Sequence, residues 1–303
     1  MLKKFEPFQA KNVLQKIENE DMLSPARYTL NPYRGCAVGC RYCYVQQKKY
    51  TDSSGLEAEK DHVVQVKINA PFLLKKKLET EIDKGLIVIG ESCEAFSDAE
   101  DEYFITQRLL EVLKEYNFPV HIITRFPRVV RDIQILRQIN TKNSVYVTVS
   151  IPVISKRLTE KLEGKSPPVR ERLKTISMMR KNDICTGVAI SPVIPYISDD
   201  KELKKVLKKA WEYGAMYVLF SPLIIKEYQK DMFFSWLSSK YPKLVNKYEK
   251  LYLDRELPDK FYWDNFSNDI NNVVSELGME VGLPYDNGQM QQELLKINNY
   301  GRI

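Results

Sequence analysis

Three of the five cysteines in this chain lie within eight residues, in the segment Cys36-Ala-Val-Gly-Cys40-Arg-Tyr-Cys43. A cubane iron–sulfur cluster contains four irons and is normally held by four cysteine thiolates. A loop with three cysteines therefore leaves one iron without a protein ligand and open to another molecule. The spacing predicts that Cys36, Cys40 and Cys43 bind a [4Fe-4S] cluster. Gly35 and Gly39 fit this prediction, because a loop that wraps a cluster needs backbone conformations that other residues adopt only with strain.

Two other uses of clustered cysteines agree less well with the sequence. A structural zinc site has four ligands, usually in two paired knuckles, and the remaining candidates are the isolated Cys93 and Cys185 or the two histidines. A disulfide framework usually has an even number of cysteines and a secretory context. This chain has five cysteines and begins Met-Leu-Lys-Lys-Phe-Glu, without an apolar signal segment. Free cysteines predict a cytoplasmic protein, because the cytoplasm is reducing and an oxygen-sensitive cluster survives there.

The overall composition is that of a globular enzyme rather than a membrane protein. No stretch approaches the roughly 18 apolar residues of a membrane span. The chain has 46 Lys and Arg against 40 Asp and Glu, a balance that permits a polyanionic partner without requiring one. Its 303 residues suffice for one barrel, or for a core domain with an appendage.

Short β-branched runs alternate with amphipathic helical segments along most of the chain. Six runs have the pattern of buried parallel strands: 27–30, 85–90, 119–124, 144–150, 186–191 and 216–221. The helical segments between them include 103–116, 128–139, 168–181 and 200–213. This alternation predicts an α/β fold, a partial (β/α)6 barrel of the TIM type in which helices cover the sheet.

The pattern changes beyond about residue 225, where charged and aromatic helical segments follow at 228–251 and 265–277 without a candidate strand. We therefore expect three parts: an N-terminal segment over 1–25, the partial barrel over 26–225 and a helical C-terminal extension over 226–303.

Polar residues follow the predicted strands at their carboxyl ends, where the ligand and catalytic residues of such barrels gather. Cys93 follows the second strand, Arg125 the third and Ser150 the fourth. Each has an ordinary structural explanation: Arg125 could pair with a surface carboxylate, and Ser150 could cap a helix. Their common position nevertheless predicts that they lie together on one rim of the barrel.

Several segments resemble a known family. Tyr28-Thr-Leu-Asn-Pro-Tyr-Arg-Gly-Cys36, with the cysteines that follow, resembles the opening motif of the radical-SAM group that contains spore photoproduct lyase and the DNA repair photolyase-like proteins. Two later segments also resemble motifs of this group: Val64-Gln-Val-Lys-Ile-Asn-Ala-Pro71 and Ile190-Ser-Pro-Val-Ile-Pro195. The resemblance extends from about residue 25 to residue 277.

The resemblance implies a cofactor pair and a reaction type. S-adenosylmethionine (SAM) would chelate the open iron, one electron from the cluster would cleave the sulfonium, and the resulting 5′-deoxyadenosyl radical would abstract a hydrogen atom. The electron would come from an external donor such as flavodoxin or ferredoxin.

The resemblance also implies roles for individual residues. Tyr42 would shield the cluster and present its backbone to the adenine, while Arg125, Ser150 and Arg172 would hold the carboxylate and ribose of SAM. Arg125 stands where relatives usually carry lysine, and a planar guanidinium does not simply replace a point charge.

Cys93 lies in the loop that, in spore photoproduct lyase, contains a cysteine that returns a hydrogen atom to the substrate radical. The resemblance thus implies that Cys93 is a hydrogen donor, and the alternative is a small buried residue that fills the barrel mouth. The adjoining Glu94-Ala-Phe-Ser replaces the Asp-Pro-Tyr-Gln common in the group. This departure lies on the substrate side, so a shared substrate does not follow.

Three functions remain open from the sequence. The first is a radical-SAM enzyme acting on nucleic acid, in lyase-type DNA repair or in modification, with Lys75–Lys77, Arg128, Arg131 and the basic run 204–209 near phosphates. The second is a radical-SAM enzyme acting on a peptide, a protein or a small metabolite, selected by the acidic stretch 91–102. The third is a non-catalytic iron–sulfur protein that transfers electrons or acts as a sensor.

Overall fold

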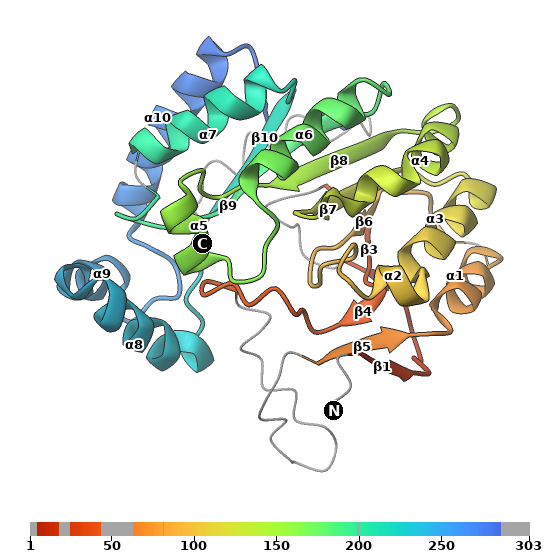
Figure 1. Cartoon of the computed structure of the whole chain (residues 1–303), viewed down its shortest axis with the longest axis horizontal. Helices are drawn as coiled ribbons and strands as arrows, with labels where there is room; N and C mark the ends of the chain where they lie inside the picture. The colour runs from red at the N-terminus through yellow and green to blue at the C-terminus, as the bar shows by residue number, and fades with distance from the viewer. Residues whose placement is uncertain (1–4, 18–24, 44–62, 81, 199, 286–303) are drawn as a thin grey trace.

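The computed structural model describes residues 5–17, 25–43, 63–80, 82–198 and 200–285. Its main sheet has eight strands in the order β11-β10-β9-β8-β7-β6-β3-β2 (Figure 1). Six neighbouring strands are parallel: β3 (Tyr28–Leu30), β6 (Ile87–Ile89), β7 (Val120–Thr124), β8 (Val145–Ser150), β9 (Cys185–Val193) and β10 (Tyr217–Pro222). They coincide with the six predicted runs, so the predicted partial (β/α)6 barrel is confirmed.

Two short strands complete the edges of this sheet. β2 (Leu14–Lys16) pairs antiparallel with β3, and β11 (Glu280–Val281) pairs parallel with β10. The sequence pattern did not predict either strand. Their two or three residues are too few for a visible alternation of apolar and polar side chains.

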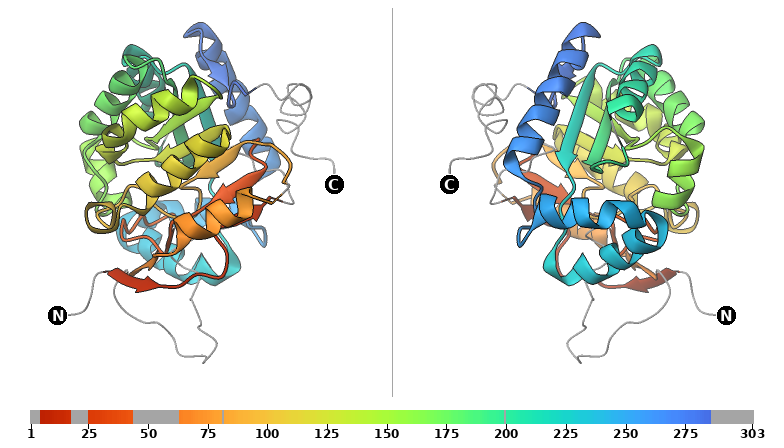
Figure 2. Two further views of the ribbon diagram at one scale, coloured as in Figure 1. Left: turned by 90° about the vertical axis from the view of Figure 1, so that its right-hand side faces the viewer. Right: turned by 90° about the vertical axis from the view of Figure 1, so that its left-hand side faces the viewer.

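Helices cover the outer face of the sheet. They are α1 (Ala70–Leu78), α3 (Ile105–Tyr116), α4 (Ile133–Asn140), α6 (Val169–Arg180) and α7 (Asp200–Glu212), with the short α2 (Glu100–Tyr103), α5 (Lys156–Leu162) and the 3-10 helix Pro127–Asp132 between them. The left view of Figure 2 shows α1, α3 and α4, coloured orange to yellow-green, in front of the strands. Ile87 and Ile89 pack into the core shared with these helices, whereas Val88 belongs to a cluster on the other face. Burial on both faces explains the continuous apolar strands.

Inside the barrel, the ring of Tyr217 packs directly against the backbone of Gly187 in β9. Its hydroxyl lies 2.7 Å from Oγ1 of Thr148, which in turn lies 2.7 Å from Nε2 of His121. Burial lowers the pKa of His121 to about 3, so the imidazole is neutral at physiological pH. A Cβ on Gly187 would lie 2.3 Å from a ring carbon of Tyr217. The barrel therefore needs glycine at this position of β9.

A second, small sheet lies beside the barrel in the order β1-β5-β4, formed by β1 (Phe5–Phe8), β5 (Val64–Lys67) and β4 (Tyr33–Arg34). β4 pairs antiparallel with β5 and leads directly into the cysteine loop. The segment Val64-Gln-Val-Lys forms β5, and its pairing with β4 thus holds the chain in position at the start of the cysteine loop.

The C-terminal extension contains α8 (Lys230–Lys240), α9 (Val245–Tyr252) and α10 (Lys260–Glu276), with short 3-10 helices at Glu227–Gln229 and Pro242–Leu244. The single helix expected over 228–251 is interrupted at Pro242, whose ring cannot continue a helix. α10 starts earlier than expected, because Asp259 caps it by accepting hydrogen bonds from the amides of Phe261 and Tyr262. β11 also departs from the expected all-helical extension. The right view of Figure 2 shows α10 beside the strands and α8 and α9 beneath them.

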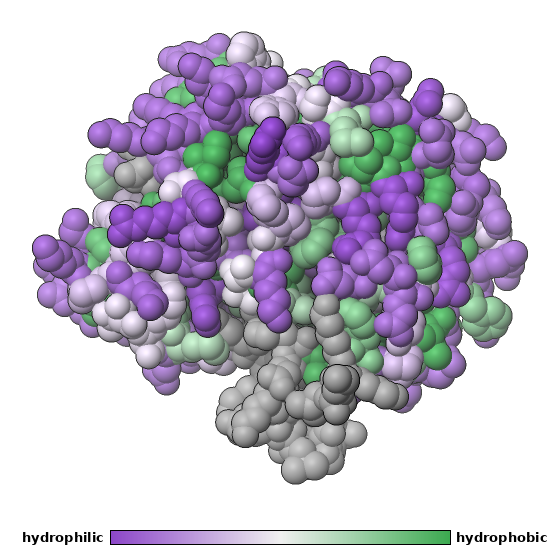
Figure 3. All heavy atoms as spheres, in the orientation of Figure 1, coloured by the Kyte–Doolittle hydropathy of each residue, from purple (hydrophilic) through white to green (hydrophobic). Residues whose placement is uncertain are grey.

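The face seen in Figure 3 is covered mainly by hydrophilic side chains, and apolar side chains appear there only in small separated groups. Within the described ranges, no helix has the length and apolar character needed to cross a membrane.

Replacing Gly187 with alanine should destabilise the barrel, because Tyr217 cannot move away from the new Cβ without losing its hydrogen bond to Thr148. Overpacking of this kind usually costs about 1–3 kcal/mol, which urea denaturation would measure as a lower free energy of unfolding. In a Tyr217→Leu background the same substitution should cost less, because the ring atoms are absent. An equal cost in both backgrounds would rule out this contact as the cause.

Candidate functional site

The cysteine loop follows β4 and has the backbone expected from its glycines. Gly35 and Gly39 have φ angles of 80° and 78°, in the left-handed region that favours glycine. The amide of Arg41 donates to the carbonyl of Leu162 at 2.8 Å, and the amide of Lys165 donates to the carbonyl of Val38 at 2.7 Å. The turn after α5 therefore holds the loop by its backbone.

The C-terminal extension packs against the same loop. Val38, Cys40 and Tyr42 share one apolar cluster with residues of α8 and α9, among them Phe233 and Tyr248. The aromatic residues of the extension thus pack against the cysteine loop and support it.

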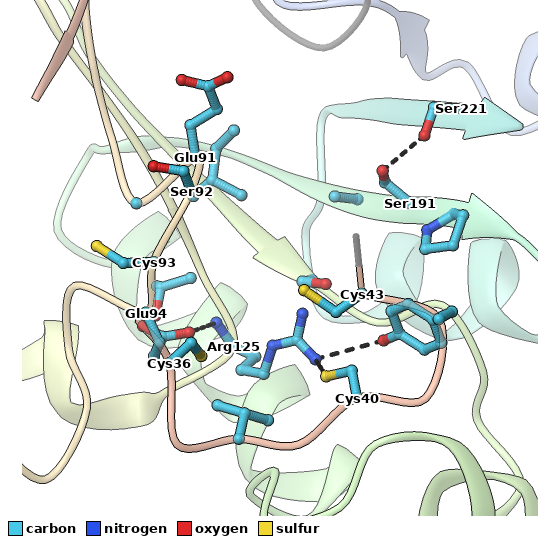
Figure 4. Close-up of a pocket in the computed structure, with 18 of the residues that line it drawn as sticks. Cys36, Cys40, Cys43, Glu91, Ser92, Cys93, Glu94, Arg125, Ser191 and Ser221 are labelled. Atoms are coloured by element: carbon cyan, nitrogen blue, oxygen red, sulfur yellow. Dashed lines mark hydrogen bonds between the residues drawn. The ribbon is translucent and has the colours of Figure 1, made fainter. Parts of the chain in front are cut away.

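One cavity of about 250 Å³ lies between the cysteine loop and the carboxyl ends of the strands. The polar and sulfur-containing side chains that line it come from the loop, from the segment after β6 and from the ends of β7 to β10. They are Cys36, Cys40, Tyr42, Cys43, Glu91, Ser92, Cys93, Glu94, Thr124, Arg125, Ser150, Ser191 and Ser221. Figure 4 shows Arg125 among the three loop cysteines, with Glu91 and Cys93 to one side and Ser191 and Ser221 to the other. The structure thus brings together seven of the eight predicted site residues.

Arg125 connects the strand end to the cysteine loop (Figure 4). Its Nη1 atom lies 2.8 Å from Sγ of Cys40, 3.1 Å from Oε1 of Glu163 and 3.3 Å from the hydroxyl of Tyr42. Only 16% of its side chain is exposed. The surface ion pair considered as the ordinary explanation for Arg125 is therefore replaced by a buried contact with Glu163.

Arg172 is the predicted site residue that does not line the cavity among the described residues. Its side chain and that of Glu163 are both fully buried and form an ion pair at 2.8 Å. Arg172 also donates to the backbone carbonyls of Pro167 and Ser150. Its contact with SAM stays a prediction, and the structure places it behind the cavity wall, where it holds Glu163 and the end of β8.

Tyr42 lies against the same carboxylate. Its hydroxyl donates to Oε1 of Glu163 at 3.0 Å, and its ring is buried in the cluster with the C-terminal extension. Burial raises the pKa of Tyr42 well above its usual range, so the phenol remains a hydrogen-bond donor. The side chain is thus oriented away from solvent and anchored beside Cys40.

The three free cysteines of the loop supply sulfur, the donor atom that iron–sulfur clusters take from proteins. Burial raises the pKa of Cys36 to about 11 and of Cys40 to about 12, the latter against an opposing effect of Arg125. Both thiols are protonated at neutral pH, and metal binding releases these protons. In the described part of the chain, no three His, Cys, Asp or Glu side chains are arranged to bind a single metal ion. In a cubane each thiolate binds a different iron, so the sulfurs need not converge on one point.

Cys93 lies in the cavity wall outside the loop. It is 7% exposed, and its Sγ donates to Oδ1 of Asn31 at 3.5 Å. Burial raises the pKa of this thiol to about 12, so it keeps its hydrogen at neutral pH. Nζ of Lys67 donates to the carbonyl of Asn31 at 2.8 Å and thereby fixes the residue that Cys93 contacts.

Three carboxylate or amide residues organise the site, and the sequence did not predict these roles for them. Glu94 is buried and accepts hydrogen bonds from the amide and hydroxyl groups of neighbouring residues, including the amide of Arg125 at 3.1 Å. Glu163 and Asn31 form the contacts described above. Glu94 follows a predicted strand, so its position could have indicated it, whereas the roles of Glu163 and Asn31 depend on partners far away in the sequence.

The basic residues proposed to meet phosphates do not form one surface. Arg128 pairs with Asp98 and Asp101, and Arg131 pairs with Glu100 and Asp132. These two arginines are thus paired with carboxylates, and their contact with a nucleic acid stays a prediction. Lys75–Lys77 lie at the end of α1 and the run 204–209 lies on α7, at opposite ends of the helical layer (Figure 1).

Comparisons with known proteins agree with this geometry. A family model described as the radical SAM superfamily matches residues 30–210. An uncharacterized protein of Mycobacterium bovis is 28% identical over 251 residues, which cover 82% of this chain and 73% of the relative. The spore photoproduct lyase of Clostridium acetobutylicum is 23% identical over 209 residues, covering 67% of this chain and 59% of the lyase.

Solved structures show the same fold. Spore photoproduct lyase complexed with dinucleoside spore photoproduct superposes with a TM-score of 0.66 at 12% identity, covering 91% of this chain and 81% of the lyase. SuiB of Streptococcus suis, bound to the precursor peptide SuiA, has a TM-score of 0.53 at 11% identity, covering 84% of this chain and 48% of SuiB.

The family match covers the cysteine loop, the barrel strands β6 to β9 and the cavity residues up to Pro192. The chain therefore belongs to the radical SAM superfamily, a family of enzymes whose cofactors are a [4Fe-4S] cluster and SAM.

Proposed function

We propose that this protein binds the cluster through Cys36, Cys40 and Cys43, cleaves SAM reductively and abstracts a hydrogen atom from a nucleic acid in a repair or modification reaction. The observation that carries the proposal is the single cavity in which the three loop cysteines, the strand-end residues Arg125 and Ser150, and Cys93 meet. When bound, the cluster and SAM supply the carbon-centred radical that abstracts hydrogen.

Different residues in and behind the cavity wall would bind different parts of SAM or position the residues that do. Ser150 lines the cavity from the end of β8, where its hydroxyl can donate to the carboxylate or accept from the ribose. Arg125 contacts Cys40 and Glu163 through Nη1, and its guanidinium supplies the positive charge for the carboxylate of SAM. Arg172 acts through Glu163 and the carbonyl of Ser150, and it thus positions both groups. Tyr42 covers the loop beside Cys40.

Two observations support nucleic acid as the substrate class. The fold resembles that of spore photoproduct lyase complexed with dinucleoside spore photoproduct, and a thiol occurs in the cavity outside the loop. A peptide is the second candidate, because SuiB bound to its precursor peptide shares the fold and because Glu91 lines the cavity with a carboxylate that suits a cationic substrate. Binding of single- and double-stranded DNA across a salt series separates the two, since phosphate contacts weaken steeply with salt.

Cys93 is proposed to return the hydrogen atom. Its S–H bond would break homolytically while a C–H bond forms on the substrate radical, leaving a sulfur-centred radical at Cys93. An electron from the external reductant, a low-potential donor such as flavodoxin or ferredoxin, and a proton from solvent would restore the thiol. The raised pKa of Cys93 supports this role, because only the protonated thiol carries the hydrogen to be transferred.

The first test of the proposal is iron binding. Anaerobically reconstituted protein should contain about four irons and four sulfides per chain. Replacing Cys36, Cys40 or Cys43 with alanine should abolish this content, whereas Cys185→Ala should retain it, because Cys185 lies at the start of β9, away from the cavity. Full iron content after the loss of two loop cysteines would contradict the assignment.

The second test is SAM cleavage. With dithionite as reductant, the loaded protein should form 5′-deoxyadenosine and methionine, measured by liquid chromatography. Ser150→Ala should weaken SAM binding by about 0.5–1.5 kcal/mol, the usual contribution of a neutral hydrogen bond, with the cluster intact. Ser144→Ala, at the opposite end of β8, is the matched control. A loaded protein that never cleaves SAM would instead favour the non-catalytic electron-transfer or sensing function.

The third test concerns Cys93, with dinucleoside spore photoproduct as the probe substrate in D2O. Thiol hydrogens exchange with solvent, so the wild-type product should carry one deuterium that originates from Cys93. Cys93→Ala should still bind the cluster and cleave SAM, but its product should lose this label or be replaced by trapped adducts, as mass spectrometry would show. Normal products with unchanged label, together with a loss of about 1 kcal/mol in the free energy of unfolding, would contradict the donor role and show that Cys93 only fills space.

A further inference from the structure

The guanidinium of Arg125 points at a cluster ligand. Its Nη1 atom lies 2.8 Å from Sγ of Cys40, and Figure 4 shows the side chain crossing the cavity wall to reach this sulfur. A thiolate bound to iron keeps lone pairs that accept hydrogen bonds. The same N–H donor can therefore contact Cys40 when the cluster is present.

The direction of this donor is set by a buried anchor. Oε1 of Glu163 lies 3.1 Å from Nη1 of Arg125, and Glu163 is itself held by Arg172 in a fully buried ion pair. The hydroxyl of Tyr42 lies 3.3 Å from the same Nη1 atom. Contacts from the turn after α5 and from the cysteine loop thus hold Nη1 in place beside Cys40.

A fixed cation beside a ligating sulfur changes the free-energy difference between the oxidised and reduced states of the cluster. A cluster with three thiolates carries net negative charge, and one-electron reduction increases that charge. Hydrogen bonds to the sulfurs and nearby charge are established determinants of the reduction potential of iron–sulfur clusters. Their effect is larger in a buried site, where the effective dielectric constant is low.

We propose that Arg125 tunes the cluster: the Nη1–H···Sγ hydrogen bond to Cys40, anchored by Glu163, stabilises the reduced state and raises the reduction potential. The inference rests on the proposed cluster at Cys36, Cys40 and Cys43. Nη1 contacts both the sulfur and the carboxylate of Glu163, so the buried carboxylate holds the donor at the sulfur.

The experiment measures the reduction potential of the reconstituted cluster in the absence of SAM, by redox titration followed by electron paramagnetic resonance. Arg125→Met removes the donor and the charge with similar length. Glu163 keeps its pair with Arg172, so the variant should fold. At a fixed solution potential, we expect the ratio of reduced to oxidised cluster to fall about tenfold, a shift of about 59 mV to more negative values for one electron.

Arg128→Met is the matched control. Arg128 lies three residues further along the chain and pairs with Asp98 and Asp101 rather than with a cysteine, so its loss should leave the potential unchanged. A wild-type potential in Arg125→Met would overturn the inference while leaving the cluster assignment intact.

Arg125→Lys keeps the charge but not the fork, and it decides the question if the methionine variant does not load iron. A negative shift in Arg125→Lys supports the hydrogen bond, and a wild-type potential overturns it. Loss of the cluster from both variants would also overturn it, because Arg125 would then be needed for assembly rather than for tuning. A wild-type protein without any cluster would overturn the proposed function together with this inference.

Discussion

The organisation of the site depends on one buried carboxylate. Glu163 has no exposed side-chain surface and receives Arg125 from the end of β7, Arg172 from α6 and the hydroxyl of Tyr42 from the cysteine loop. A buried charge is tolerated only when it is paired and hydrogen-bonded. Arg172 alone still pairs Glu163 when Arg125 is absent, whereas loss of Glu163 would leave the buried Arg172 without its ion pair, so the carboxylate joins the three segments.

The cysteine loop is short and irregular, and it is held from several directions. Its backbone bonds to the turn after α5, its apolar residues pack against α8 and α9, and Arg125 contacts it from the strand side. Loops that carry function are usually positioned by a rigid scaffold in this way. The C-terminal extension is therefore part of the support for the loop.

The cavity contains two sets of thiols in different surroundings. Cys40 lies beside a guanidinium and a buried carboxylate, whereas Cys93 contacts the neutral amide of Asn31. Burial raises the pKa of both, but only the loop cysteines have the spacing that lets them act together as ligands. Neighbouring thiols in one cavity can thus serve different chemistry, because their partners differ.

The sequence alone determined the six strands and the set of side chains at the strand ends, and it predicted the three loop cysteines as cluster ligands. These are local patterns: the cysteine spacing acts within one loop, and alternating strands and helices produce a parallel sheet whose carboxyl ends meet at one edge. Only the tertiary structure decided that Glu163 joins Arg125 and Tyr42, that Arg172 lies behind the cavity wall, and that Arg128 and Arg131 are engaged by carboxylates. Tyr42 and Glu163 are 121 positions apart, and Arg125 and Cys40 are 85 apart. Contacts over such separations leave no periodic signal in the chain, because they are set by how the barrel closes and packs.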